Sequence, residues 1–212
     1  MGLLVWRWPS PLAVLSSAPV GGGFRLAAWV LNIGVPLSYR RTDLDEHCDE
    51  IASSLGLDGQ GVALFTAANV AEGQRRSVGD VTVDATVGIS KPTWAADPDG
   101  HWTPWQPGTV NLVIQLASPL EAGAAANAVI TATEAKTQAF LDAGVPGTGT
   151  ASDAVVIAWP ANPSEPEQRF AGPRSAIGSQ IAQAVHASVA AGISAWMQTN
   201  IEQRTADEAA GR

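Results

Sequence analysis

Short apolar segments bounded by glycine and proline follow one another along most of this chain, largely without helices between them. Residues 12–17 and 25–33 flank the turn Gly21-Gly22-Gly23, where glycine permits the positive φ of a tight reversal. Further strands are predicted at 61–67, 78–87, 108–117 and 153–159. An alternating doubly wound fold would place a helix after nearly every strand. The direct succession of strands therefore predicts an α+β fold with a mixed sheet.

Three helices are predicted between and after these strands, at residues 42–55, 118–143 and 175–196. Ser118-Pro119 has the pattern of an N-cap followed by proline at the first helical position. In the last helix, Ile177, Ile181 and Val185 recur at helical spacing. We expect a single layered domain over residues 1–196, with about three helices on the sheet, followed by a polar tail at 197–212.

Charge and composition exclude several functional classes. The 212 residues carry a net charge of −8 without any run of Lys or Arg, which disfavours phosphate-neutralising nucleic-acid binders and polybasic membrane attachment. No apolar stretch approaches the length of a membrane span. The first residues lack a basic region, and Arg7, Pro9 and Pro11 interrupt their apolar run. We expect a cytoplasmic protein whose partners include neither nucleic acid nor membrane; a homo-oligomer is compatible with the sequence.

The single cysteine and the three histidines point to no metal centre. Cys48 alone excludes an internal disulfide and a multi-cysteine zinc site. Its acidic neighbours raise a thiol pKa, so it is a poor nucleophile. His47, in the same acidic helix, is expected at the surface. His186 borders the apolar stripe of the last helix, where it is either a general base or a structural residue.

A polar stripe inside the long helix is the first candidate site. Its residues Asn127, Thr131, Glu134 and Gln138 fall at i, i+4, i+7 and i+11, which places them on one face. Hydroxyl and amide groups suit a pocket wall, where desolvating full charges is costly. The stripe equally fits a polar contact between the helix and another element.

The glycine-rich segment Gly147-Thr-Gly-Thr-Ala-Ser-Asp153 is the second candidate. Small residues let backbone N–H groups approach a ligand, so the segment is suited to stabilising an oxyanion. It is equally compatible with a flexible turn between helix and strand. Further pocket candidates are Asp84 and Thr86 on the polar face of their strand and Asn111. Trp94, Trp102 and Trp105 in a proline-rich loop form either a surface for a flat apolar ligand or a plug for the sheet end.

Several segments, in this order, together resemble the adenosylcobinamide amidohydrolase family. They are Val14-Leu-Ser-Ser-Ala-Pro19 with Gly21-Gly-Gly23, Val30-Leu-Asn32, Leu64-Phe-Thr-Ala-Ala68, Asp84-Ala-Thr-Val-Gly88, Gly108-Thr-Val-Asn111, Thr131-Ala-Thr-Glu-Ala-Lys136, Gly147-Thr-Gly-Thr-Ala-Ser-Asp153 and Phe170-Ala-Gly-Pro-Arg-Ser175. The likeness covers roughly residues 12–192. The long-helix motif followed by Gly-Thr-Gly-Thr is its most distinctive part.

The resemblance implies hydrolysis of the amide that joins a corrin propionate side chain to aminopropanol. Its products would be adenosylcobyric acid and 1-amino-2-propanol, in the salvage of cobalamin precursors. Cobalt would enter as part of the corrinoid substrate, and no cofactor or protein-bound metal is expected. Two alternatives stay open, namely a corrinoid-binding protein without catalysis and an amidohydrolase of a different, smaller amide.

For the reaction, we expect Glu134 to activate water and pass the proton to the leaving amine, while the backbone of residues 147–150 holds the oxyanion. A covalent route through Thr148, Thr150 or Ser152 is the alternative. The candidates for catalysis are Glu134, Thr148, Thr150, Asp153 and His186. The candidates for substrate binding are Asn32, Asp84, Thr86, Asn111, Asn127, Thr131, Arg174, Trp94 and Trp102.

Overall fold

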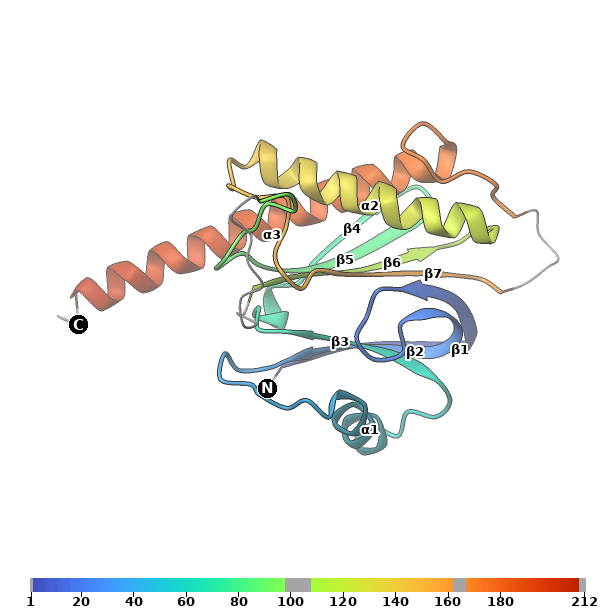
Figure 1. Ribbon diagram of the computed structural model, residues 1–212, viewed down its shortest axis with the longest axis horizontal. Coiled ribbons are helices and arrows are strands. Elements are labelled where there is room, and N and C mark those ends of the chain that lie inside the picture. The colour runs from blue at the N-terminus through green and yellow to red at the C-terminus, as the bar shows by residue number, and fades with distance from the viewer. Residues whose placement is uncertain (1, 98–107, 162–166, 210–212) are drawn as a thin grey trace.

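The computed structural model describes residues 2–97, 108–161 and 167–209, with side chains up to residue 202 (Figure 1). Within these ranges the chain forms one seven-stranded sheet and three α-helices. The strands are β1 (Leu3–Ser16), β2 (Gly23–Gly34), β3 (Gly61–Thr66), β4 (Gln74–Val78), β5 (Val81–Gly88), β6 (Thr109–Leu116) and β7 (Ala154–Trp159). The helices are α1 (Leu44–Ser54), α2 (Ala122–Asp142) and α3 (Ala176–Ala209), and a short 3₁₀ turn, η1, spans Val70–Glu72.

The sheet has the order β3-β2-β1-β7-β6-β5-β4. The pairs β2–β3 and β6–β7 are parallel, and the remaining neighbours are antiparallel. The predicted α+β fold, with a mixed sheet and about three helices, is confirmed.

This sheet folds back on itself at β1. β1 pairs with β2 along most of its length, but with β7 only through Ala13–Ser16. The register of β1 shifts between Arg7 and Leu12, where Pro9 and Pro11 lie; proline is tolerated in such irregular strand positions because it cannot donate to the ladder. Figure 1 shows β1–β3 as a layer beneath β4–β7, with α2 and α3 above and α1 below. The molecule therefore has four layers.

Strand alternation divides the apolar side chains among three cores. On β7, Val155 and Ile157 pack toward α2 and α3, while Val156 packs into the space between the two halves of the sheet. On β2, Leu31 packs toward α1 and Val30 packs toward the other half-sheet. A side chain's place in the strand period thus decides which layer it meets.

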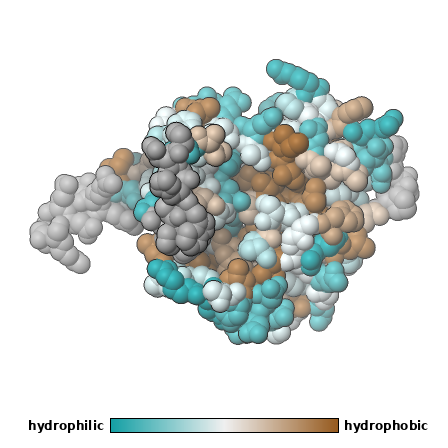
Figure 2. Space-filling model, viewed as in Figure 1, coloured by the Kyte–Doolittle hydropathy of each residue, from teal (hydrophilic) through white to brown (hydrophobic). Residues whose placement is uncertain are grey.

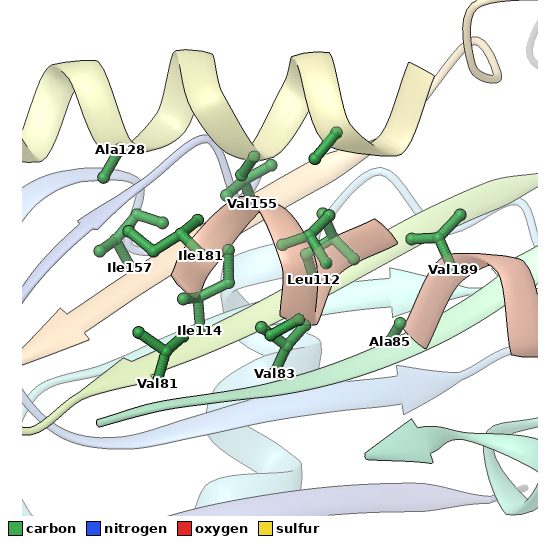
Figure 3. Packing of buried hydrophobic residues seen from close by; sticks show 14 of the residues in the cluster. Val81, Val83, Ala85, Leu112, Ile114, Ala128, Val155, Ile157, Ile181 and Val189 are labelled. Atoms are coloured by element: carbon green, nitrogen blue, oxygen red, sulfur yellow. The ribbon is translucent and has the colours of Figure 1, made fainter. Parts of the chain in front are cut away.

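The helix-covered face of β4–β7 is the largest of these cores. α2 contributes mainly buried alanines, which let it lie close to the strands and to α3. Figure 3 shows Ala128 of α2 and Ile181 and Val189 of α3 converging on Val83 and Leu112 of the sheet. These contacts hold the long helices firmly on the sheet.

Some predicted boundaries were wrong. β1 begins at Leu3 rather than near residue 12, and the strand predicted from residue 78 is the second arm of a hairpin. Its first arm, β4, was missed because it is a polar edge strand; Gly79 forms the turn with a φ of 54°. α2 begins at Ala122, so Ser118-Pro119 is not its cap. α3 continues to Ala209 past the sheet, so the polar tail predicted from residue 197 is helical as far as Ala209.

Candidate functional site

A pocket of about 430 Å³ opens where the two halves of the sheet meet. One wall comes from the ends of β2 and β3 and from the loop that leads to α1; the other comes from the starts of β6 and β7. The lining residues are Pro19, Val35, Tyr39, Arg40, Arg41, Thr42, Leu44, Phe65, Thr109, Asn111, Ser152 and Ala154. A concave, largely apolar site with a few convergent polar groups is typical of small-molecule binding.

A chain of buried amides joins the two half-sheets beside this pocket. The Nδ2 of Asn32 on β2 donates to the Oγ1 of Thr86 on β5 at 2.9 Å. The Nδ2 of Asn111 on β6 donates to the Oδ1 of Asn32 at 2.9 Å and to the carbonyl oxygen of Phe65 at 3.1 Å. All three polar side chains are buried. The structure thus brings together three of the predicted binding residues, Asn32, Thr86 and Asn111.

Asn111 ends this chain with an oxygen that lacks a partner. Its side chain is 1% exposed, and its Oδ1 accepts no hydrogen bond. The two acceptors of its Nδ2 fix the orientation of the amide, because turning it over would face its oxygen toward those acceptors. A buried carbonyl left without a donor costs about 1–3 kcal/mol. Among the described residues, a buried acceptor beside the pocket therefore still lacks a donor.

Two hydroxyls lie on the same wall. The Oγ1 of Thr109 and the Oγ of Ser152 are 2.6 Å apart, and Ser152 also donates to the carbonyl oxygen of Gly108 at 3.2 Å. Hydroxyl groups rotate to donate or accept, so this pair is able to serve a carbonyl oxygen of a ligand. Ser152 was considered in the sequence as a nucleophile, whereas Thr109 was missed although it lies in the quoted segment Gly108-Thr-Val-Asn111.

Asp153 supports this wall from behind. Its carboxylate accepts from the backbone N–H of Val110 at 2.8 Å, from the N–H and hydroxyl of Thr150, and from the Nζ of Lys136 on α2. Lys136 is buried and lies 5.9 Å from the centre of the Phe140 ring. One buried carboxylate thus ties α2 to the chain segments on either side of Asn111 and Ser152. Thr150 and Asp153, both predicted for catalysis, do lie together.

The backbone of the glycine-rich segment is already engaged. The N–H of Gly147 donates to Val145, that of Thr148 to Thr93, and that of Thr150 to Asp153. The Thr148 hydroxyl accepts from the N–H of Ala95 at 3.0 Å. These bonds leave few donors for an oxyanion, so the structure does not favour the predicted oxyanion role of residues 147–150.

Tyr39 lines the pocket on the loop wall and contacts His47 behind it, and here the sequence was misleading. His47 was expected at the surface, but it is buried. The Oη of Tyr39 and the Nδ1 of His47 are 2.7 Å apart, and both rings lie near the Phe65 ring. α1 turns His47 inward because the sheet covers that side of the helix. Tyr39 was missed altogether, since an isolated tyrosine in a polar loop carries no pattern.

The loop that carries Tyr39 is fastened to α1 by Arg41. Its guanidinium bonds to Asp43 and to Glu50, with shortest distances of 2.6 and 2.8 Å. These hydrogen bonds lower the pKa of both carboxyl groups and raise the pKa of Arg41. The neighbouring Arg40 donates to the carbonyl oxygens of Leu37 and Tyr39. Loop and helix therefore form one unit at the mouth of the pocket.

Two predicted catalytic residues lie away from the pocket. Glu134 is exposed on α2. His186 lies on the outer side, where its Nε2 is 2.8 Å from the Oδ2 of Asp142 and links α3 to α2. Neither lines the pocket. The separation of exposed Glu134 from buried Lys136 follows from their positions on opposite sides of the helix.

The remaining predicted binding residues are spread over the molecule. Asp84, two residues before Thr86 on β5, accepts from the indole of Trp6 and from Arg75 and does not line the pocket. The Thr131 hydroxyl donates to the carbonyl of Ala171, which matches the alternative of a polar helix contact. Outside the pocket lie also the partly buried Asn127 and the exposed Arg174 and Trp94. Trp102 and Trp105 lie outside the described residues.

Within the described ranges, no three His, Cys, Asp or Glu side chains gather as a metal site would require. The absence of a catalytic metal remains a prediction. Cys48 is buried, and its burial together with Asp49 and Asp45 raises the pKa of the thiol to about 11. This confirms the predicted direction, although burial is the larger cause. In the same part of the chain, no helix has the length and apolar character to cross a membrane.

An α+β fold with a largely apolar pocket and a few convergent amide and hydroxyl groups has the features of a small-molecule site. A sequence profile of the adenosylcobinamide amidohydrolase family matches residues 1–201. The adenosylcobinamide amidohydrolase of Methanosarcina mazei is 28% identical over 184 residues, covering 84% of this chain and 88% of that protein. The one from Halobacterium salinarum is 32% identical over 180 residues, covering 81% and 76%. The chain belongs to the adenosylcobinamide amidohydrolase family.

Proposed function

We propose that this protein hydrolyses the amide between aminopropanol and the corrin ring of adenosylcobinamide, and that the pocket beside Asn111 holds this amide. The products are adenosylcobyric acid and 1-amino-2-propanol, which serve the salvage of cobalamin precursors. Family membership supports the reaction. The unpartnered Oδ1 of Asn111 carries the assignment of the place, because the scissile bond of this substrate has one N–H and that oxygen lacks one donor.

The size of the pocket defines which part of the substrate enters. A volume of about 430 Å³ accommodates the aminopropanol arm and its amide, but not a corrin ring with its adenosyl ligand. The ring accordingly rests outside the pocket. Leu44, Phe65 and Val35 supply apolar contact for the methylene groups of the arm.

Two kinds of polar group then orient the amide. The Oδ1 of Asn111 accepts from the amide N–H, and the hydroxyls of Thr109 and Ser152 donate to its carbonyl oxygen. As water attacks the carbonyl carbon, negative charge grows on that oxygen, and donors fixed in a water-poor site stabilise it. Asp153 keeps these segments in place through Val110 and Thr150. The exposed position of Glu134 favours another group as the base.

The proposal also covers the cofactor, the location and the partners that we expect from the sequence. Cobalt is carried by the substrate, no further cofactor takes part, and the protein works in the cytoplasm on its corrinoid without nucleic acid or membrane as partner. The acidic net charge of −8 supports the exclusion of nucleic acid.

The test is incubation of the purified protein with adenosylcobinamide, without added metal, followed by mass spectrometry of the corrinoid products. Adenosylcobyric acid is expected from the wild-type protein. Asn111→Ala should lower kcat/KM by about 100-fold. Removing one contact that orients the reacting amide costs about 2.7 kcal/mol of transition-state stabilisation. Asn69→Ala, an exposed asparagine of the η1 turn, is the matched control and should retain full activity.

Three results would change the proposal. Corrinoid binding seen in the absorption spectrum without product would indicate a binding protein. Cleavage of a small amide in place of the corrinoid would indicate a different amidohydrolase. Full activity of Asn111→Ala would move the reaction away from this pocket.

A further inference from the structure

Amide hydrolysis needs a group that takes a proton from the attacking water and gives one to the departing nitrogen. The Asn111 wall does not contain such a group, since its polar members are amides and hydroxyls. The facing wall contains Tyr39, whose Oη lies 2.7 Å from the Nδ1 of His47. Among the described residues, this is the pocket-lining side chain that contacts an imidazole.

We propose that Tyr39 is a catalytic residue of this family member and that His47, acting through Tyr39, completes a proton relay. The inference rests on the proposed function and deepens it, because it names the acid–base machinery of the same site. His47 does not touch the substrate and is a positioning and proton-storing residue.

The two walls are physically joined, which places the pair close to the amide. The backbone carbonyl of Phe65 accepts from Asn111, while the Phe65 ring lies 6.0 Å from the Tyr39 ring and 5.8 Å from the His47 ring, centre to centre. Tyr39 and His47 are themselves stacked, with ring centres 5.6 Å apart. This three-ring cluster gives the phenol a fixed position, as a catalytic group requires.

The charges around His47 fit a proton acceptor. On the side of α1, Asp43 and Glu50 interact electrostatically with His47, and both carboxylates are held by Arg41. On the other sides the ring meets Tyr39 from the loop and the apolar Phe65 from β3. Burial raises the pKa of Tyr39, so its phenol stays protonated at neutral pH. A free phenolate is therefore disfavoured. Tyr39 must give its own proton to His47 at the same time as it takes one from water.

The proton steps balance. As water attacks the carbonyl carbon, a water proton passes to the Tyr39 oxygen while the phenol proton passes to the Nδ1 of neutral His47. The tetrahedral intermediate then collapses, and the C–N bond breaks. The Tyr39 proton goes to the departing nitrogen while the imidazolium returns its proton to Tyr39. The net result is one water consumed, one acid and one amine formed, and both side chains restored.

The experiment compares kcat and KM of the wild-type protein, Tyr39→Phe and His47→Asn for adenosylcobinamide between pH 5 and pH 8. Phenylalanine keeps the ring stack without the hydroxyl, and asparagine keeps a polar group near the position of Nδ1 without titrating. Loss of general acid–base catalysis lowers kcat by about 10²–10⁴-fold. We expect a loss of at least about 100-fold in both variants, with KM within about threefold.

The pH profile separates catalysis from mere support of the loop. Wild-type kcat should fall toward pH 5, because a protonated imidazole takes up no further proton, and this acidic limb should be absent in the residual rate of His47→Asn. Asp43 and Glu50, with their lowered pKa, titrate below this window. Glu46→Gln, an exposed neighbour on α1, is the matched control and should retain both the rate and the limb.

The outcomes keep the two proposals apart. A wild-type protein that binds the corrinoid spectroscopically without cleaving it would overturn the proposed function and the relay together. Normal wild-type turnover with Tyr39→Phe within threefold of it would overturn the relay alone. An unchanged acidic limb in His47→Asn would do the same. If Tyr39→Phe fails to fold, judged by its thermal transition, the His47→Asn profile decides.

Discussion

The two halves of the sheet are stabilised in different ways. The β4–β7 half lies under two long helices and a wide core of alanine, valine and isoleucine side chains. The β1–β3 half is covered by the single short helix α1, whose smaller core includes the pocket-lining Phe65 and Tyr39. Figure 2 shows apolar surface exposed between polar regions on the face viewed there. The comparison indicates that one half acts as the scaffold, while the thinly covered half supplies the wall that carries Tyr39 and Phe65.

The largest expected effect lies at the joint between scaffold and site. Lys136→Met removes the buried ammonium that bonds to Asp153 and leaves that carboxylate without its countercharge. Breaking a buried pair costs about 3–5 kcal/mol of unfolding free energy. Urea unfolding measures this loss of unfolding free energy. The control is Arg169→Met, which removes the exposed ion pair with Glu121 and should change the unfolding free energy by less than about 1 kcal/mol. If Lys136→Met and Arg169→Met both lowered the unfolding free energy by equally small amounts, Asp153 would not depend on α2 for its position.

Matched isoleucines test the difference between the two cores directly. Ile181 of α3 is fully buried on the scaffold, whereas Ile51 of α1 is only partly buried. Ile181→Ala should cost about 2–5 kcal/mol, and Ile51→Ala about 1 kcal/mol, because less surface is lost and no closed cavity forms. Chemical denaturation of both variants gives the comparison. A larger loss at Ile51 would contradict the assignment of α2 and α3 as the main support.

The smallest effect concerns the attachment of the 36–43 loop in acid. Arg41 lowers the pKa of Asp43 and Glu50 from their ordinary 3.8 and 4.5. Their contribution to the folded loop is therefore complete above about pH 4.5 and is lost as the pH falls through the lowered values. The protection factors of the amides in this loop, which correct for the pH dependence of intrinsic exchange, should fall below pH 4, while those of α2 stay high. In Arg41→Gln the loop should exchange faster already at pH 7; an unchanged rate would show that other contacts hold it.

Residue patterns allowed much of the fold to be predicted. Alternation located β5, short apolar segments located β6 and β7, and helical spacing located the buried face of α3. The patterns failed where burial is weak: β4 is a polar edge strand, and α3 extends beyond the sheet. Thr86 and Asn111 were predicted as pocket residues and Asn32 came from the segments that resemble the family; the structure joins the three by hydrogen bonds, and their role in binding stays a prediction.

Sequence alone thus determined the α+β class and the family, since each depends on local residue order. Only the tertiary structure decided which polar groups meet. Asn32 and Asn111 bond across 79 residues, and Asn32 and Thr86 across 54, because the sheet folds back at β1 and brings β2 against β5 and β6. The pairing of Tyr39 with His47 likewise depends on the side of α1 that faces the sheet. No spacing rule encodes contacts that arise from the folding of one layer onto another.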